Sequence, residues 1–280
     1  MGNRGEGKSQ FINQILIKPW AKKYGADFAK IGEEESKGVF KFVERKNFWN
    51  FPIPSQPASS YSETILVCQV EYQEEYFSLE CSLKLTQKEK KKIEFQLTQF
   101  TNDVGSWEIK YEKKKNEKNN SKIQDQNSSS KFKLKIFQSK KVKGMDQFEL
   151  RKNLIEISKI ISFLNKNWES VISKLNNIDE KVGKIQAIKK LILRGPFESL
   201  LLKHKGIDIP IHLQDVPGLG SLNKYEIENV EYAAKKCDIA FLFCGKRGID
   251  TTDLTNLLKA CKNREKVGLG RNNLFHFYNF

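Results

Sequence analysis

The fold of this chain is predicted by a glycine-rich stretch at its start, Gly2-Asn3-Arg4-Gly5-Glu6-Gly7-Lys8-Ser9-Gln10. Residues 2–9 have the spacing G-x-x-x-x-G-K-S of a phosphate-binding loop, whose glycines let backbone N–H groups surround an anion. Residues 11–16 are typical of the first turns of a helix, and a helix N-terminus attracts phosphate. In such a loop the lysine contacts the β- and γ-phosphates and the serine hydroxyl binds Mg²⁺. The stretch therefore predicts a nucleotide site, against the alternative of a solvated glycine-rich turn.

A second motif of the same kind of site lies some two hundred residues later, in Asp215-Val216-Pro217-Gly218. It fits D-x-x-G and follows residues 207–214, whose alternating apolar side chains predict a strand that ends at the motif. A carboxylate at this position holds Mg²⁺, usually through water, and the glycine N–H contacts the γ-phosphate. D-x-x-G alone is a weak signal, but downstream of a phosphate-binding loop it strengthens the prediction of a nucleotide site.

Strands and helices alternate through the last quarter of the chain. Further apolar strands are expected at 239–244 and 273–278, with helices at 224–236 and 252–263. Such alternation predicts an α/β fold with a parallel sheet that helices cover on both faces. A buried strand should also precede the phosphate-binding loop, and only Met1 stands there, so we expect the first strand of the sheet to be missing from this sequence.

Two strands are predicted nearer the start, after an irregular segment at 18–62. Residues 64–72 and 76–85 are rich in β-branched and alternating apolar side chains, and only residues 73–75 separate them. A connection of three residues predicts an antiparallel hairpin. The irregular segment itself is long enough to be a functional loop.

Positive charge is concentrated in one part of the chain. The net charge is +15, and residues 84–145 contribute +10 of it, with 17 Lys, no Arg and 7 acidic residues. Their Lys, Asn, Gln and Ser content predicts a disordered insert at 86–145, with a short strand near 132–136. Binding of nucleic acid or of an anionic membrane by this region is the weaker alternative, because it has few aromatic side chains for stacking.

A long helical region follows the basic insert, at 146–193. Its apolar residues recur at alternating spacings of four and three, which is the stripe of a helix that packs along other elements. Both an intramolecular core face and a seam for self-association fit this stripe. Its members are Leu150, Leu154, Ile157, Ile161, Leu164, Trp168, Val171, Leu175, Ile178, Val182 and Ile185.

The sequence thus divides into four segments: 1–85 with the phosphate-binding loop, irregular segment and hairpin, the insert 86–145, the helical insert 146–193, and 194–280 with D-x-x-G. Its five cysteines lack a C-x-x-C pair and lie mostly in apolar runs, as reduced thiols do in intracellular proteins, so we expect a cytoplasmic or nuclear location. No apolar run of 18 residues predicts a membrane span.

Together these motifs resemble the dynamin-related large GTPases, and among them the nuclear GTPases of the SLIP-GC type. The resemblance covers roughly 1–85 and 190–280 and rests on the phosphate-binding loop, on Asp215 to Gly220, and on the stretch Gly195-Pro196-Phe197-Glu198-Ser199-Leu200-Leu201. It implies a three-layer P-loop fold, GTP and Mg²⁺ as ligands, and GTP hydrolysis coupled to conformational change or self-association. It also implies a Mg²⁺-binding threonine in the segment before the second strand, for which Thr64 is the candidate and Ser59, Ser60 and Ser62 are rivals.

The chain departs from the pattern of this family at several points. Leu219 follows D-x-x-G where small GTPases carry a water-orienting Gln, as is usual in dynamin relatives. A guanine-reading N/T-K-x-D motif, expected after a strand ending near Phe280, is not in the sequence, so guanine specificity rests on the resemblance alone. A truncated relative that does not hydrolyse nucleotide and acts as an interaction scaffold is therefore the alternative function.

Arg4 stands where dynamins carry a Gln in the phosphate-binding loop, and with Lys8 it is the candidate catalytic residue. An arginine placed there would stabilise charge on the transferred phosphoryl group, an effect worth roughly 10³- to 10⁵-fold in rate. We expect Arg4→Ala to slow single-turnover GTP hydrolysis within this range. An Arg4→Ala variant with unchanged nucleotide affinity and unchanged turnover contradicts the assignment.

Overall fold

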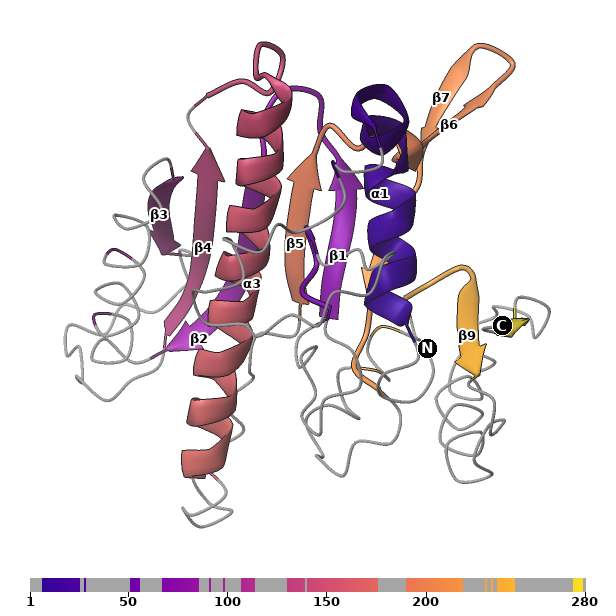
Figure 1. Cartoon of the computed structure of the whole chain (residues 1–280). Helices are drawn as coiled ribbons and strands as arrows, with labels where there is room; N and C mark the ends of the chain where they lie inside the picture. The colour runs from indigo at the N-terminus through magenta and orange to yellow at the C-terminus, as the bar shows by residue number, and fades with distance from the viewer. Residues whose placement is uncertain are drawn as a thin grey trace.

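The structure is a computed structural model of the 280-residue chain (Figure 1). It describes residues 7–25, 28, 51–55, 67–85, 91, 98, 107–113, 130–138, 140–175, 190–218, 230, 233, 236–244 and 274–278. The α/β class predicted from the sequence is confirmed for this part of the chain, and its sheet is mixed, not purely parallel.

A six-stranded sheet forms the body of the described structure (Figure 1). Strands β1 and β5 run parallel at its centre, and the other neighbouring strands are antiparallel. Its order is β3 (Trp107–Lys113), β4 (Ser130–Gln138), β2 (Ser78–Leu85), β5 (Lys190–Gly195), β1 (Val67–Tyr72) and β8 (Leu213–Asp215).

The described residues also form two sheets of two strands each. Strands β6 (Leu201–His204) and β7 (Ile207–Pro210) form an antiparallel hairpin, joined to the body by the 3₁₀ turn η3 (Glu198–Leu200). Strands β9 (Ala240–Cys244) and β10 (Leu274–Tyr278) pair in parallel, and both were predicted from their apolar runs.

Two helices, α1 (Lys8–Tyr24) and α3 (Gln147–Leu175), lie on the same face of the six-stranded sheet (Figure 1). Successive side chains of a strand point to opposite faces of the sheet, and in this sheet the apolar ones lie on the face that the helices cover. One core results, and it includes Leu16 and Ile17 of α1, Leu154 and Ile157 of α3, and Cys68, Val70, Leu79, Leu134, Leu191 and Leu193 of the strands.

The other face of the sheet carries a row of polar side chains that crosses five strands. Gln214 donates to Gln69, and Gln69 donates to Glu71. Arg194 then bonds both Glu71 and Glu80, with N to O distances of 2.7 and 3.0 Å, and Lys133 pairs with Glu80 at 2.7 Å. Burial of an unpaired charge would destabilise the sheet, and in this row each half-buried charge is paired with one of opposite sign.

The predicted hairpin of 64–72 with 76–85 is wrong, although both segments contain strands. Strand β5 lies between β1 and β2 and pairs with each of them. Two strand spacings are about 10 Å, which the connection 73–77 spans, and the Gln73 N–H bonds the Gly195 carbonyl on its way, at 2.8 Å. The short connection between β1 and β2 therefore passes over β5, a strand more than a hundred residues later in the sequence.

The prediction of a disordered insert at 86–145 is wrong where β3 lies, whereas the short strand predicted near 132–136 is confirmed as the middle of β4, which is longer than predicted. In β4, Leu134 and Ile136 point into the core while Lys133 and Lys135 lie on the polar face. Lysines at alternate positions are compatible with a strand because each keeps its charge on the polar face of the sheet. Composition averaged over the whole segment concealed strand β3 and the full length of β4.

The stripe at 146–193 is an intramolecular core face where the structure describes it, since Leu150, Leu154, Ile157, Ile161 and Leu164 are buried in the core. The boundary predicted between 193 and 194 is wrong, because it divides strand β5. Residues 176–189, the predicted helix at 252–263 and most of that at 224–236 lie outside the described residues.

Two predicted element bounds also need correction. The irregular segment does not begin at residue 18, because α1 continues to Tyr24 and includes Pro19. The single strand predicted at 207–214 is two strands, β7 and β8, which belong to different sheets.

Gly195, at the end of β5, is a position where only a glycine fits. A Cβ there would lie 2.4 Å from the Phe77 ring and 2.9 Å from that of Phe197, and both rings are fully buried. We expect Gly195→Ala to lower the free energy of unfolding by about 1–3 kcal/mol through overpacking. Urea unfolding measures the loss, and the double variant Gly195→Ala with Phe77→Leu should cost less than the two single changes combined. An unchanged unfolding midpoint for Gly195→Ala would contradict this packing.

Candidate functional site

The two motifs predicted from the sequence meet in the structure. The Ser9 hydroxyl donates a hydrogen bond to the Asp215 carboxylate, with 2.6 Å between Oγ and Oδ2, across 206 positions of the chain. Strand β8 runs antiparallel to β1 and ends at Asp215, beside the first turn of α1. The topology of the sheet therefore places the carboxylate of D-x-x-G beside the serine of the predicted phosphate-binding loop.

The start of α1 has the backbone geometry that its sequence requires. Gly7 precedes the helix with φ of 75°, in the left-handed region. A residue with a Cβ would destabilise this backbone conformation by roughly 1–2 kcal/mol, which explains why a glycine occupies this position. No acidic residue of α1 stands in its first turn, so the positive end of the helix dipole next to Lys8 is not opposed by a carboxylate of the helix itself.

Asp215 lies in a largely dry environment, with 1% of its surface exposed. Cys68 is its partner in the register of β1 with β8. The pKa of the Cys68 thiol is raised, first by burial and then by the negative charge of Asp215. Cys68 therefore stays a neutral thiol and does not compete with the carboxylate as an anionic ligand.

The structure describes some of the predicted site residues and not others. Gly7, Lys8, Ser9 and Gln10 lie at the start of α1, and Gly218 is buried just after β8, three residues beyond Asp215. The predicted residues outside the described part are Gly2, Asn3, Arg4, Gly5, Glu6 and Thr64.

Asn13 is a residue of the site region that sequence reasoning missed. It is fully buried, and its side-chain amide bonds both backbone groups of Ile53, donating to the carbonyl at 2.7 Å and accepting from the N–H at 3.0 Å. It thereby fixes residues 51–55, a part of the predicted functional loop, to helix α1. The available signal was its position on the helix face that carries Leu16 and Ile17, since a polar residue on a buried face has a partner.

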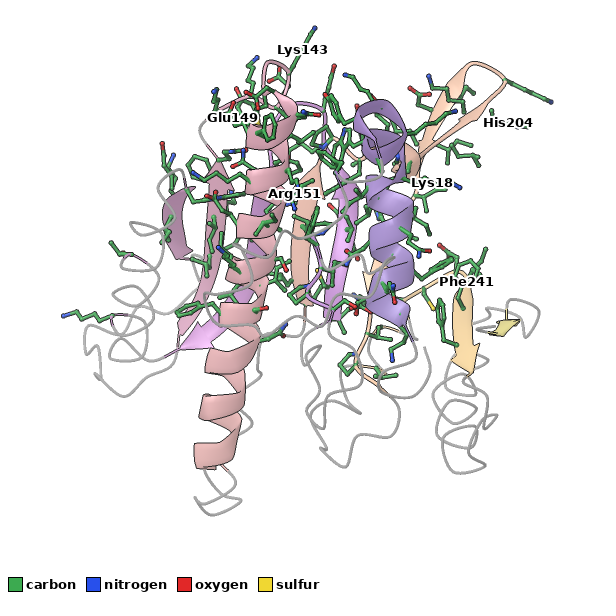
Figure 2. The ribbon with its side chains drawn as sticks, viewed as in Figure 1. Lys18, Lys143, Glu149, Arg151, His204 and Phe241 are labelled. Carbon is green, nitrogen blue, oxygen red and sulfur yellow. The ribbon has the colours of Figure 1, made fainter. Side chains whose placement is uncertain are left out.

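Helix α3 also contacts the irregular segment predicted at 18–62. Arg151, labelled in Figure 2, donates to the Phe28 carbonyl at 3.2 Å, and its guanidinium lies 6.0 Å from the centre of the Phe51 ring. Residues 51–55 thus contact α1 through Asn13 and α3 through Arg151.

Strand β9 packs against the first turns of α1. The Phe11 ring lies 5.2 Å from that of Phe243 and 6.4 Å from that of Phe241, which Figure 2 labels beside the helix. These aromatic contacts bring the C-terminal strands to the end of α1 that carries Ser9.

Comparisons with known proteins add no relative: no protein-family model matches the chain, and neither does any curated protein. Among the described residues, no group of three or more His, Cys, Asp or Glu side chains could hold a metal ion. Of the helices in the described part, none combines the length and the apolar character needed to cross a bilayer.

Removal of the Asn13 side chain tests its role in fixing residues 51–55. In Asn13→Ala the N–H and carbonyl of Ile53 lose their buried partners, and each unsatisfied group costs about 1–3 kcal/mol. We expect a lower unfolding midpoint and faster hydrogen exchange at the Ile53 amide. The control is Gln14→Ala, an exposed position of the same helix. Equal exchange at Ile53 in both variants would show that the amide does not hold this segment.

Proposed function

We propose that this chain binds GTP with Mg²⁺ and hydrolyses it, in a P-loop domain of the dynamin-related type. The observation that carries the proposal is the hydrogen bond of 2.6 Å between Ser9 and Asp215. Two motifs far apart in sequence, each with a separate expected role at one Mg²⁺-nucleotide site, meet at side-chain distance. A solvated glycine-rich turn gives no reason for this meeting.

The residues present fit a magnesium ion. Mg²⁺ prefers oxygen ligands and uses few protein groups together with phosphate and water. The Ser9 hydroxyl and the Asp215 carboxylate supply such oxygens, and in the proposed state they would bind the ion directly and through water. The ion would neutralise charge on the β- and γ-phosphates. Thr64 remains the proposed third contributor.

The remaining residues of the site would bind and orient the phosphates. Backbone N–H groups around Gly7 and the start of α1 suit an anion. Lys8 would contact the β- and γ-oxygens, and the N–H of Gly218 would contact the γ-phosphate. Arg4 would stabilise charge that develops during transfer.

The same contacts suggest how nucleotide state would reach the rest of the molecule. Asn13 lies one turn after Ser9 and bonds the backbone of Ile53, while Arg151 of α3 contacts Phe51. A change in the position of α1 on hydrolysis would therefore be transmitted to the irregular segment and to the long helix. Guanine as the base and the three-layer arrangement follow from the family resemblance.

Variants of the two motifs test the proposal by equilibrium binding of labelled GTP and ATP, with and without Mg²⁺. Loss of a hydrogen bond to a charged group costs about 1.5–3 kcal/mol, so Lys8→Ala should weaken binding roughly 10- to 150-fold. Ser9→Ala and Asp215→Asn should chiefly reduce the increase in nucleotide affinity that Mg²⁺ produces. The matched control is Lys18→Ala, an exposed lysine of the same helix.

Three outcomes separate the alternatives. Failure of the intact chain to bind either nucleotide would eliminate the proposal, as would equal binding by the wild type and Lys8→Ala. Binding of GTP without turnover would support the non-hydrolysing scaffold. Tighter binding of ATP than of GTP would overturn guanine specificity and leave the phosphate site intact.

A further inference from the structure

The hairpin of β6 and β7 projects from the body at the end of the sheet opposite to the start of α1 (Figure 1; Figure 2 labels His204 on it). In its register Leu202 lies opposite Ile209, and His204 lies opposite Ile207. Residues directly opposite share a face, so Leu202, Ile207 and Ile209 form one apolar face, at whose end His204 also lies. Their exposed fractions are 53%, 65% and 42%. Exposed aliphatic groups gathered on one face are typical of interaction surfaces.

The backbone edges of the hairpin follow from its register. In an antiparallel pair, opposite residues alternate between exchanging hydrogen bonds and directing their backbone groups outward. The Ile211 N–H bonds the Leu200 carbonyl at 2.8 Å, so the bonded pairs are 200 with 211, 202 with 209, and 204 with 207. The outward positions are therefore Leu201 and Lys203 on β6, and Asp208 and Pro210 on β7.

The two edges are not equivalent. Pro210 stands at an outward position of β7 and has no N–H to donate, so this edge is blocked for a further strand. On β6, the Leu201 N–H bonds the Glu198 carbonyl, which leaves the Lys203 N–H and the carbonyls of Leu201 and Lys203 directed outward. Among the described strands none pairs with this edge of β6.

Charge distinguishes between kinds of partner. Lys203 lies directly opposite Asp208 in the register, so the charge at the open edge is balanced by its cross-strand neighbour, and Lys205 lies beyond the strands in the turn. The apolar face carries the His204 imidazole but no carboxylate or ammonium group. An acidic peptide or an anionic lipid surface gains little from such an edge. A neutral strand with the same apolar face suits it better.

We propose that the partner is a second copy of this chain, joined β6 to β6 in an antiparallel pair about a twofold axis. Outward residues must meet outward residues, and a register centred on Leu202 satisfies this by placing Lys203 opposite Leu201 of the other copy. The two Leu202 side chains then meet at the axis, and no two lysines stand opposite each other. The joined sheet has the order β7-β6-β6-β7.

The geometry also limits the assembly. Because Pro210 blocks both outer edges of the joined sheet, pairing closes at two copies and does not extend into a fibre. A hairpin of this size buries far less than the roughly 800 Å² per partner of a stable interface, so the dimer is reversible and dependent on concentration. A two-stranded hairpin is only marginally stable alone, and pairing doubles its strands.

The test measures mass in solution over a concentration series, by sedimentation equilibrium of the full chain. Lys203→Pro removes an N–H that the dimer uses twice and leaves the bonds within the hairpin intact, so it should raise the dimer dissociation constant at least about tenfold. Asp208→Pro makes the same chemical change on the blocked edge and should leave the dissociation constant unchanged.

A second pair of variants keeps the test independent of proline. Leu202→Asp should abolish association, whereas Phe148→Asp, at a residue that is 74% exposed on α3, should not. Circular dichroism and thermal unfolding check that each variant folds. Added salt should preserve or strengthen association, because it screens the positive charge of the two chains.

Several results would overturn the inference: a monomer at all concentrations, a dimer that Lys203→Pro and Asp208→Pro weaken equally, or a dimer insensitive to Leu202→Asp. Flotation with vesicles of phosphatidylcholine and phosphatidylserine tests whether the partner is a lipid surface instead. Binding to these vesicles that Leu202→Asp removes, by a chain that stays monomeric, would replace the second copy by a lipid surface. The inference does not depend on nucleotide binding, so Lys8→Ala should dimerise like the wild type.

Discussion

Packing of helix α1 on the sheet is the interaction on which the described structure depends. Its buried face places Leu16 and Ile17 in the core, and its first turns contact both β8, through Ser9 and Asp215, and β9, through Phe11. Burial of one aliphatic side chain of this size contributes about 1.5–3 kcal/mol. The apolar face therefore holds the helix in place, and the polar groups at its start and on its inner side acquire defined partners as a result.

The two faces of the sheet solve different physical problems. The face under α1 and α3 excludes water by close packing, and Gly195 makes room there for two buried phenylalanine rings. The opposite face keeps charged side chains in a sheet by pairing them, with Arg194 between Glu71 and Glu80. This division explains why a lysine-rich segment contributes β4, because its lysines and its aliphatic residues fall on opposite faces.

The candidate site was predicted from the sequence through motifs whose chemistry requires particular residues at a particular spacing. Lys8, Ser9 and Asp215 were identified in this way, and their proximity was an expectation until the fold brought Ser9 to Asp215. Asn13 was missed because its partner, Ile53, lies forty residues away; its place on the buried face of α1 indicates that it has a partner but not which one. The order of β1, β5 and β2 was missed for the same reason, since the shortest connection favoured a direct hairpin.

The sequence by itself determined the α/β class, helix α3, the positions of strands such as β9, and the residue types of the candidate site. Those properties depend on periodicity and spacing along a short stretch of chain. Only the tertiary structure decided which strands are neighbours, that β4 belongs to the sheet, and that the hairpin of β6 and β7 leaves an apolar face exposed. These depend on contacts between residues far apart in sequence, whose free energy is gained only when separate segments pack together.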